Sequence, residues 1–334
     1  MSRINIANLK NFYSEKLEAQ HFQVYADCDG NLLQGKLRTV VTLEMTEKNR
    51  QAAESVVEAI VYGCPELFFI EQEVRTSWSG NQLTLDFKNK YPKENIGELW
   101  EKLNAETDRI CAIINKFQTV YDKLNRLNDY LCARVKPVSS FERSELGDAY
   151  GALILKQARC EGFAKAAKLI LDRCGIPSLI AKGEADSGCR REPHAWNIAA
   201  CGDAFYHFDF TWNAGYAAHG IPGADYMFLD DRDCGLQHFP DHKYPACTDA
   251  GKTFWAVNNG ILKYHSDLSR IRLVPFDRNY MAAAKLPRKL SQYEYENEVF
   301  GWMVNELSAH SYASTFSYRY NQVFQVLFFY FING

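Results

Sequence analysis

One segment constrains the fold of this 334-residue chain more than any other, the stretch ARCEGFAKAAKLILDRCGIP from Ala158 to Pro177. Its apolar side chains recur at helical spacing on one face, at Phe163, Ala167, Ile170, Leu171 and Cys174. Gly175 suits the left-handed position just past a helix, and Pro177 prevents the helix from continuing. The segment therefore predicts an amphipathic helix that begins at or beside Cys160.

The predicted helix start makes Cys160 a candidate nucleophile. Unpaired amides and the positive end of the helix dipole stabilise a thiolate there, and they can also hold the oxyanion that forms when sulfur attacks a carbonyl. Cys174 lies at the other end of the same helix and is expected in the core. The chain has ten cysteines but no C-x-x-C pair and no export signal, so we expect the others to be reduced packing residues.

A hairpin downstream supplies a base and a group to orient it. Gly202 and Asp203 form a plausible two-residue turn between alternating strands, from His194 to Trp212. In that register Ile198 faces His207 and Trp196 faces Asp209, so that His194 and Asp209 become diagonal neighbours on one face. A nucleophile, a base and an orienting carboxylate satisfy the geometry of a catalytic triad.

Two alternatives remain open at this point. His207 lies on the same predicted face and is a rival base, or a histidine that only packs within the sheet. A metal site built from Cys160, His194, His207 or Asp209 is the weaker alternative, because the spacing matches none of the compact zinc patterns. We expect no metal and no cofactor.

Patterning along the chain predicts an α+β protein with three parts. An N-terminal α/β module occupies residues 1–92, with strands at 35–45, 68–78 and 82–87 and a helix at 47–61. Residues 93–250 form the catalytic core, led by helices over 93–135. A C-terminal α/β module follows at 251–334, with a strand at 271–275, a helix at 291–308 and aromatic strands over 315–331. The oligomeric state is left open.

The charge balance excludes some partners. Lys and Arg number 38 and Asp and Glu number 41, a net charge of −3, so the chain lacks the basic field that non-specific nucleic-acid binding needs. Its longest apolar run falls far short of the roughly 20 residues that span a bilayer. We therefore expect no membrane partner and a cytoplasmic location.

The residues around the helix and the hairpin resemble the transglutaminase-like superfamily, and its bacterial branch in particular. The resemblance rests on Tyr150-Gly151-Ala152-Leu153, the Cys160-Glu161-Gly162-Phe163-Ala164-Lys165-Ala166 run, Gly175-Ile176-Pro177, His194-Ala195-Trp196-Asn197 and His207-Phe208-Asp209-Phe210-Thr211-Trp212. It covers roughly residues 121–247. One departure is Phe210, where the family usually has proline.

The resemblance implies a papain-like fold in which a helix packs on an antiparallel sheet. Cys160 would attack an amide or thioester carbonyl of a peptide or protein substrate, His194 would shuttle the proton, and Asp209 would orient the imidazole. Gln157 and Tyr150 are candidates for the second oxyanion donor, or a solvent-facing Gln and a buried Tyr. Trp196 and Trp212 are candidates for the cleft wall, or core rings.

The sequence thus predicts a cysteine peptidase, an amidase or an amine-transferring enzyme. The alternative is a non-catalytic module that binds peptides, proteins or glycans with the same fold.

Overall fold

The structure is a computed structural model that describes residues 11–218, 223–258, 274–276, 279–287, 289–294, 297, 301, 305 and 313–333. Its centre is a four-stranded antiparallel sheet in the order β8-β7-β6-β9, against which helix α6 (Cys160–Arg173) packs. The strands are β6 (Ser178–Asp186), β7 (Arg191–Cys201), β8 (Ala204–Phe208) and β9 (His238–Pro240). This arrangement confirms the predicted α+β class with a helix on an antiparallel sheet.

Helix α6 begins and ends where its sequence predicts. Cys160 is its first residue, and Gly175 has a φ of 71° just beyond its end. Asn197 ties the helix to the sheet, because its side-chain amide donates to the carbonyl of Ala164 over 3.0 Å. The buried Lys168 ammonium does the same, donating to the Ser178 carbonyl over 3.2 Å. The middle of α6 is thus held against β6 and against β7, the strand that carries His194.

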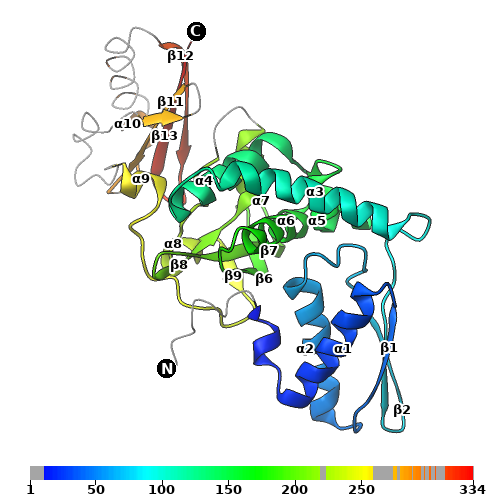
Figure 1. The fold of residues 1–334 in the computed structure, drawn as a ribbon. Coiled ribbons are helices and arrows are strands. Elements are labelled where there is room, and N and C mark those ends of the chain that lie inside the picture. The colour runs from blue at the N-terminus through cyan, green and yellow to red at the C-terminus, as the bar shows by residue number, and fades with distance from the viewer. Residues whose placement is uncertain are drawn as a thin grey trace.

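The N-terminal part of the chain forms a small sheet with two helices, at the opposite end of the molecule from the C-terminal sheet (Figure 1). Its elements are the 3₁₀ turn η2 (Ser14–Lys16), α1 (Ala19–Leu33), β1 (Arg38–Thr42), α2 (Glu47–Gly63), β2 (Arg75–Ser79) and β3 (Gln82–Asp86). The sheet order is β1-β3-β2, with Gly80 and Asn81 as the β2–β3 turn. The predicted helix and hairpin are confirmed, but residues 68–74 are not a strand: Ile70 makes only an isolated bridge to Asn89.

Helices and short segments lead into the central sheet. They are α3 (Ile96–Ile114), α4 (Val120–Arg134), β4 (Lys136–Pro137), the 3₁₀ turn η3 (Ser144–Gly147), α5 (Ala149–Leu153) and β5 (Gln157–Ala158). Strands β4 and β5 pair in parallel directly before Cys160. One buried apolar cluster extends from Val24 in α1 to Phe228, so the N-terminal elements and α3 to α6 share a core.

The remaining elements follow β8. They are α7 (Phe210–Ala217), α8 (Asp231–Cys234), α9 (Phe254–Val257), α10 (Gln292–Glu294) and an antiparallel sheet in the order β10-β11-β13-β12, from β10 (Val274–Phe276), β11 (Asn279–Lys285), β12 (Ala313–Asn321) and β13 (Val326–Asn333). The predicted aromatic strands are found as β12 and β13, whereas β11 was not predicted. Most of the helix predicted at 291–308 lies outside the described residues.

The division of the chain at residues 92 and 250 stays a prediction. Among the described helices, none is both long enough and apolar enough to cross a bilayer.

Candidate active site

Cys160 lies at the start of α6, with a partly exposed side chain. The first backbone hydrogen bond of the helix runs from the Phe163 amide to the Arg159 carbonyl over 3.1 Å. Helix geometry therefore leaves the amides of Cys160 and the next two residues without an intrahelical acceptor. Gly162 allows the start of α6 to pack closely against η3, since a Cβ at this position would lie 2.6 Å from the Leu146 carbonyl oxygen. The start of α6 is thus a fixed position that presents free donors beside a thiol.

The β7–β8 hairpin has the predicted register over its paired length. Ile198 pairs with His207 and Cys201 with Ala204 around a turn in which Gly202 has a φ of 68°. The expectation that β8 continues through Trp212 is wrong: the strand ends at Phe208 and helix α7 follows. Asp209 is the N-cap of that helix, and its Oδ1 accepts the amides of Thr211 and Trp212 over 3.0 Å each. These hydrogen bonds satisfy donors that a continuing strand would have left unpaired.

His194 and Asp209 are in contact, with Asp209 just beyond the end of β8 at the N-cap of α7, so the predicted strand pair of Trp196 and Asp209 is replaced by this cap. The imidazole Nε2 and the carboxylate Oδ2 are 2.7 Å apart, and both side chains are buried. Burial opposes ionisation of Asp209, but the charge and hydrogen bond of His194, aided by His238, hold the pKa of its carboxyl well below the usual range. Asp209 is therefore an anion that accepts hydrogen bonds at both oxygens.

Cys160 contributes to the environment of the His194 imidazole. Burial lowers the pKa of His194. The charge and hydrogen bond of Asp209 raise this pKa, and a hydrogen bond and charge interaction with Cys160 raise it further, to about 10. Since Nε2 is bonded to Asp209, the other ring nitrogen is the one free to face the sulfur. The structure thus brings Cys160, His194 and Asp209 together in that order.

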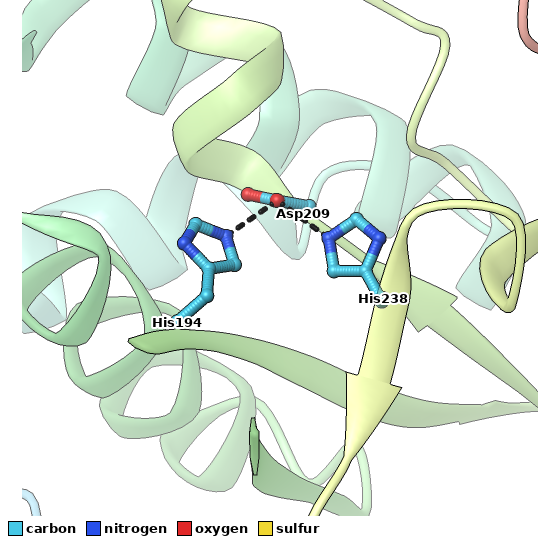
Figure 2. Close-up of side chains that lie close together, drawn as sticks. All are labelled: His194, Asp209 and His238. Atoms are coloured by element: carbon cyan, nitrogen blue, oxygen red, sulfur yellow. Dashed lines mark hydrogen bonds and ion pairs between the residues drawn. The ribbon is translucent and has the colours of Figure 1, made fainter. Parts of the chain in front are cut away.

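His238 is a second histidine on the same carboxylate, and the sequence reasoning gave it no role. It enters from β9 on the side of Asp209 opposite to His194 (Figure 2), and its Nε2 lies 3.0 Å from Asp209 Oδ2. Burial lowers the pKa of His238 despite the Asp209 charge, so the ring is neutral and donates from Nε2. Its buried Nδ1 has no partner among the described residues, which fits an unprotonated nitrogen better than a buried N–H.

Strand β9 reaches Asp209 because Gly183 allows it to. Gly183 in β6 pairs with Pro240, and a Cβ at this position would lie 2.1 Å from the Phe239 carbonyl oxygen. A glycine inside a strand marks such an approach of two backbones. Gly183 is thus a sequence signal that another backbone packs closely against β6, but it does not indicate that this backbone is β9.

His207, the rival base, is held elsewhere. Its Nδ1 accepts a hydrogen bond from Trp196 Nε1 over 3.0 Å, and its Nε2 lies 2.9 Å from Asp231 Oδ1. Both ring nitrogens are therefore occupied by partners other than Cys160. Asp231 also accepts the Cys247 amide, which anchors the segment after β9 to the hairpin.

Two groups of side chains in the described residues have ligand atoms within 4.8 Å of one another, His194 with Asp209 and His238, and His207 with Asp231 and Cys247. In the first group the same Nε2 atoms already bond to the carboxylate. In the second, both nitrogens of His207 are engaged. Hydrogen bonding accounts for both arrangements without an ion.

The two tryptophans divide between the alternatives that the sequence left open. Trp196 is fully buried, packs with Leu179 and Ile198, and is a core ring. Trp212 is half-buried and lines a surface cavity, and its ring centroid lies 5.4 Å from that of His194. Trp212 therefore covers the imidazole at the edge of an open space.

The two candidate oxyanion donors lie in different surroundings. Tyr150 is buried in an aromatic cluster, stacked on Phe68 at 5.3 Å and edge-on to Tyr91 at 5.6 Å. This packing favours the core interpretation of Tyr150. Gln157 is half-buried in β5, three residues before Cys160, and stays a prediction as the donor.

Part of the chain is similar to a known family. Residues 110–210 match the family model of the transglutaminase-like superfamily. A search of curated proteins found no match.

Solved structures with some similarity include one described as a TGase, which is 14% identical over 52% of this chain and 50% of its own, with a TM-score of 0.32. A proposed cysteine protease from Cytophaga hutchinsonii is 16% identical over 42% of this chain and 61% of its own, at 0.29. The periplasmic domain of TgpA from Pseudomonas aeruginosa is 11% identical over 42% and 55%, at 0.27.

This chain thus spans between half and about three fifths of each of these structures. The family model, in contrast, covers Cys160, His194 and Asp209 in a single match. The segment that carries these three residues is thus similar to the transglutaminase-like superfamily.

Proposed function

We propose that this protein catalyses acyl transfer from peptide or protein amides through a thioester on Cys160. The observation that supports this most strongly is the position of the His194 imidazole, which bonds Asp209 through one nitrogen and interacts with Cys160. A base with that double contact can hold a proton for the sulfur and return it to a leaving group.

The proposed reaction begins with the Cys160 thiolate and the His194 imidazolium. The sulfur attacks the amide carbonyl carbon, and the amides at the start of α6 stabilise the resulting oxyanion. His194 then protonates the leaving nitrogen as the C–N bond breaks, which releases the amine and leaves a thioester. Water or an amine attacks the thioester, gives its proton to His194, and regenerates the thiolate as the C–S bond breaks.

Asp209 would serve the reaction without exchanging a proton. Its charge stabilises the imidazolium, and its fixed hydrogen bonds to the start of α7 keep the carboxylate in one orientation.

The test is to trap the acyl-enzyme. The protein is incubated with casein peptides, quenched in acid and measured by intact mass. We expect a peptide adduct on Cys160 that Cys160→Ser abolishes and that Cys174→Ser, at the other end of the same helix, leaves unchanged. No adduct under single-turnover conditions, together with no peptide cleavage, would support the non-catalytic binding module instead.

A labelled primary amine in the same reaction separates the two fates of the thioester. Incorporation of label into casein would exclude a pure hydrolase, whereas release of free acid alone would identify a peptidase or amidase.

A further inference from the structure

A cavity of about 500 Å³ opens beside the candidate triad and has no role in the proposed acyl-transfer reaction. Its wall includes Pro137 and Val138 on one side and Trp212, Gly215 and Tyr216 of α7 on the other. The volume lies within the roughly 300–1,000 Å³ that is usual for ligand pockets.

Both sides of the cavity are attached to the candidate catalytic residues. The Val138 amide donates to the Ala158 carbonyl over 3.0 Å, two residues before Cys160. On the other side the Trp212 amide donates to Asp209 Oδ1, and the Trp212 ring lies against His194. A substrate whose carbonyl carbon lies at Cys160 would therefore have a neighbouring side chain within reach of this cavity.

The lining favours an uncharged occupant. None of the described residues that line the cavity carries a charge, and three of them are aromatic, with the Trp212 and Tyr226 rings edge-to-face at 4.9 Å. The buried polar groups are already engaged: the Tyr226 hydroxyl donates to Gln237 Oε1 over 2.8 Å, and Gln237 Nε2 donates to the Asp186 carbonyl over 3.0 Å. A charged side chain would lose water here without gaining a partner.

A cation behind the wall, Arg319, does not alter this conclusion. The Arg319 guanidinium stacks on Tyr216 at 3.8 Å, but it is paired with both oxygens of the buried Asp225 carboxylate. The pair is neutral overall, so it holds the Tyr216 ring in place without attracting an anion to the cavity.

We infer that this cavity binds a bulky uncharged side chain, aromatic or branched aliphatic, of the substrate residue that flanks the amide attacked by Cys160. The inference rests on the proposed function for the identity of the attacked bond. The substrates of the site are then peptides with a large apolar residue next to the reacting carbonyl.

Gly215 offers a way to fill the cavity without disturbing the fold. It lies in α7, and an added Cβ would meet no atom of the described residues within 4 Å. Gly215→Phe places a ring in the cavity, and Gly215→Ala is the matched control that keeps it open and favours the helix.

The first measurement is kcat/KM for two series of N-acetylated peptide amides. One series varies the residue before the cleaved bond and the other varies the residue after it. The varied residue is Phe, Leu, Ala, Glu or Lys. In one series we expect Phe and Leu to exceed Glu and Lys by about tenfold or more, the scale on which an apolar pocket discriminates. Gly215→Phe should lower kcat/KM for the Phe peptide by about tenfold and change kcat/KM for the Ala peptide by less than twofold. Equal rates across both series, or a preference for Glu or Lys, would overturn the inference.

The second measurement separates this inference from the proposed function. Binding of the same peptides to the Cys160→Ala variant is measured by titration calorimetry, which needs no turnover. Preferential binding of the Phe peptide that Gly215→Phe abolishes supports the cavity even where the intact protein forms no thioester. Equal binding of Phe, Glu and Lys peptides overturns it even where the intact protein is an active enzyme.

Discussion

The Asp209 carboxylate lies between two imidazoles, and one of them, His194, also interacts with the sulfur of Cys160. His194 faces Cys160, while His238 lies on the opposite side, neutral and buried. A neutral donor stabilises the carboxylate charge without competing for the proton that His194 carries. We therefore regard His238 as a positioning residue for the candidate triad.

This role predicts an effect of His238→Leu on the pH profile as well as on rate. Losing one charge-assisted hydrogen bond should raise the pKa of Asp209 and lower kcat by about tenfold with little change in KM. The acid limb of the kcat/KM profile should move to higher pH, and His238→Gln, which keeps an amide donor, should restore part of the rate. An unmoved acid limb with only a lower Tm would reduce His238 to a packing residue.

The ion pair of His194 and Asp209 predicts a pH-dependent stability. The pKa of Asp209 is depressed in the folded state, so its contribution is present above about pH 4 and is lost as the pH falls further. The pKa of His194 is raised to about 10, so its contribution is complete below about pH 6.5 and is lost as the pH rises toward 10. Both groups contribute fully between about pH 4 and 6.5.

The measurement is the difference in Tm between the intact protein and His194→Gln as a function of pH. We expect a maximum between about pH 4 and 6.5 and a decline on both sides. His242→Gln is the control, since that imidazole pairs with Glu58 at a half-exposed site. A difference that stays flat from pH 4 to 10 would contradict the ion pair.

At the scale of elements, the close approach of β6 and β9 determines whether His238 reaches the site. Gly183→Ala should push β9 away, destabilise the fold by about 1–3 kcal/mol as overpacking does, and shift the pH profile as His238→Leu does. Chemical denaturation and the kcat/KM profile measure the two effects. Gly30→Ala in α1 is the control, because a Cβ there would meet no described atom within 4 Å, and identical behaviour of both variants would refute the role of Gly183.

Elements with local signals could be predicted from the sequence. Helix α6 has an apolar face, a glycine stop and a proline beyond it, and the β7–β8 register follows from a two-residue turn at Gly202 and Asp203. The end of β8 could not be predicted from alternation, because the capping bonds of Asp209 outweigh the strand pattern after Phe208. His238 could not be placed either, since β9 joins β6 from about fifty residues away and only tertiary packing brings them together.

At the scale of the whole molecule, a buried ion pair joins the N-terminal part to the central body. Lys90, just after β3, lies 3.2 Å from Asp148, and both side chains are almost fully buried. Asp148 also caps α5, where its Oδ1 accepts the Gly151 amide over 2.9 Å. The N-terminal elements are thereby fixed to the helix that precedes the Cys160 segment.

Removing one partner of this pair should be costly. Asp148→Ala leaves a buried ammonium without a partner and should lower the free energy of unfolding by about 3–5 kcal/mol. Asp86→Ala, which breaks the exposed pair with Arg38, should change it by less than about 1 kcal/mol. Urea titration compares the two, and similar losses would show that Lys90 is solvated when Asp148 is absent.

The most direct test of a Cys160 nucleophile supported by His194 is the rate of alkylation by iodoacetamide at neutral pH, followed by mass spectrometry for Cys160 and Cys174 together. We expect Cys160 to react at least tenfold faster than Cys174 and a free thiol, and to lose this advantage in His194→Ala while Cys174 is unaffected. A Cys160 that reacts no faster than a free thiol, with a rate indifferent to His194→Ala, would contradict the proposed catalytic site.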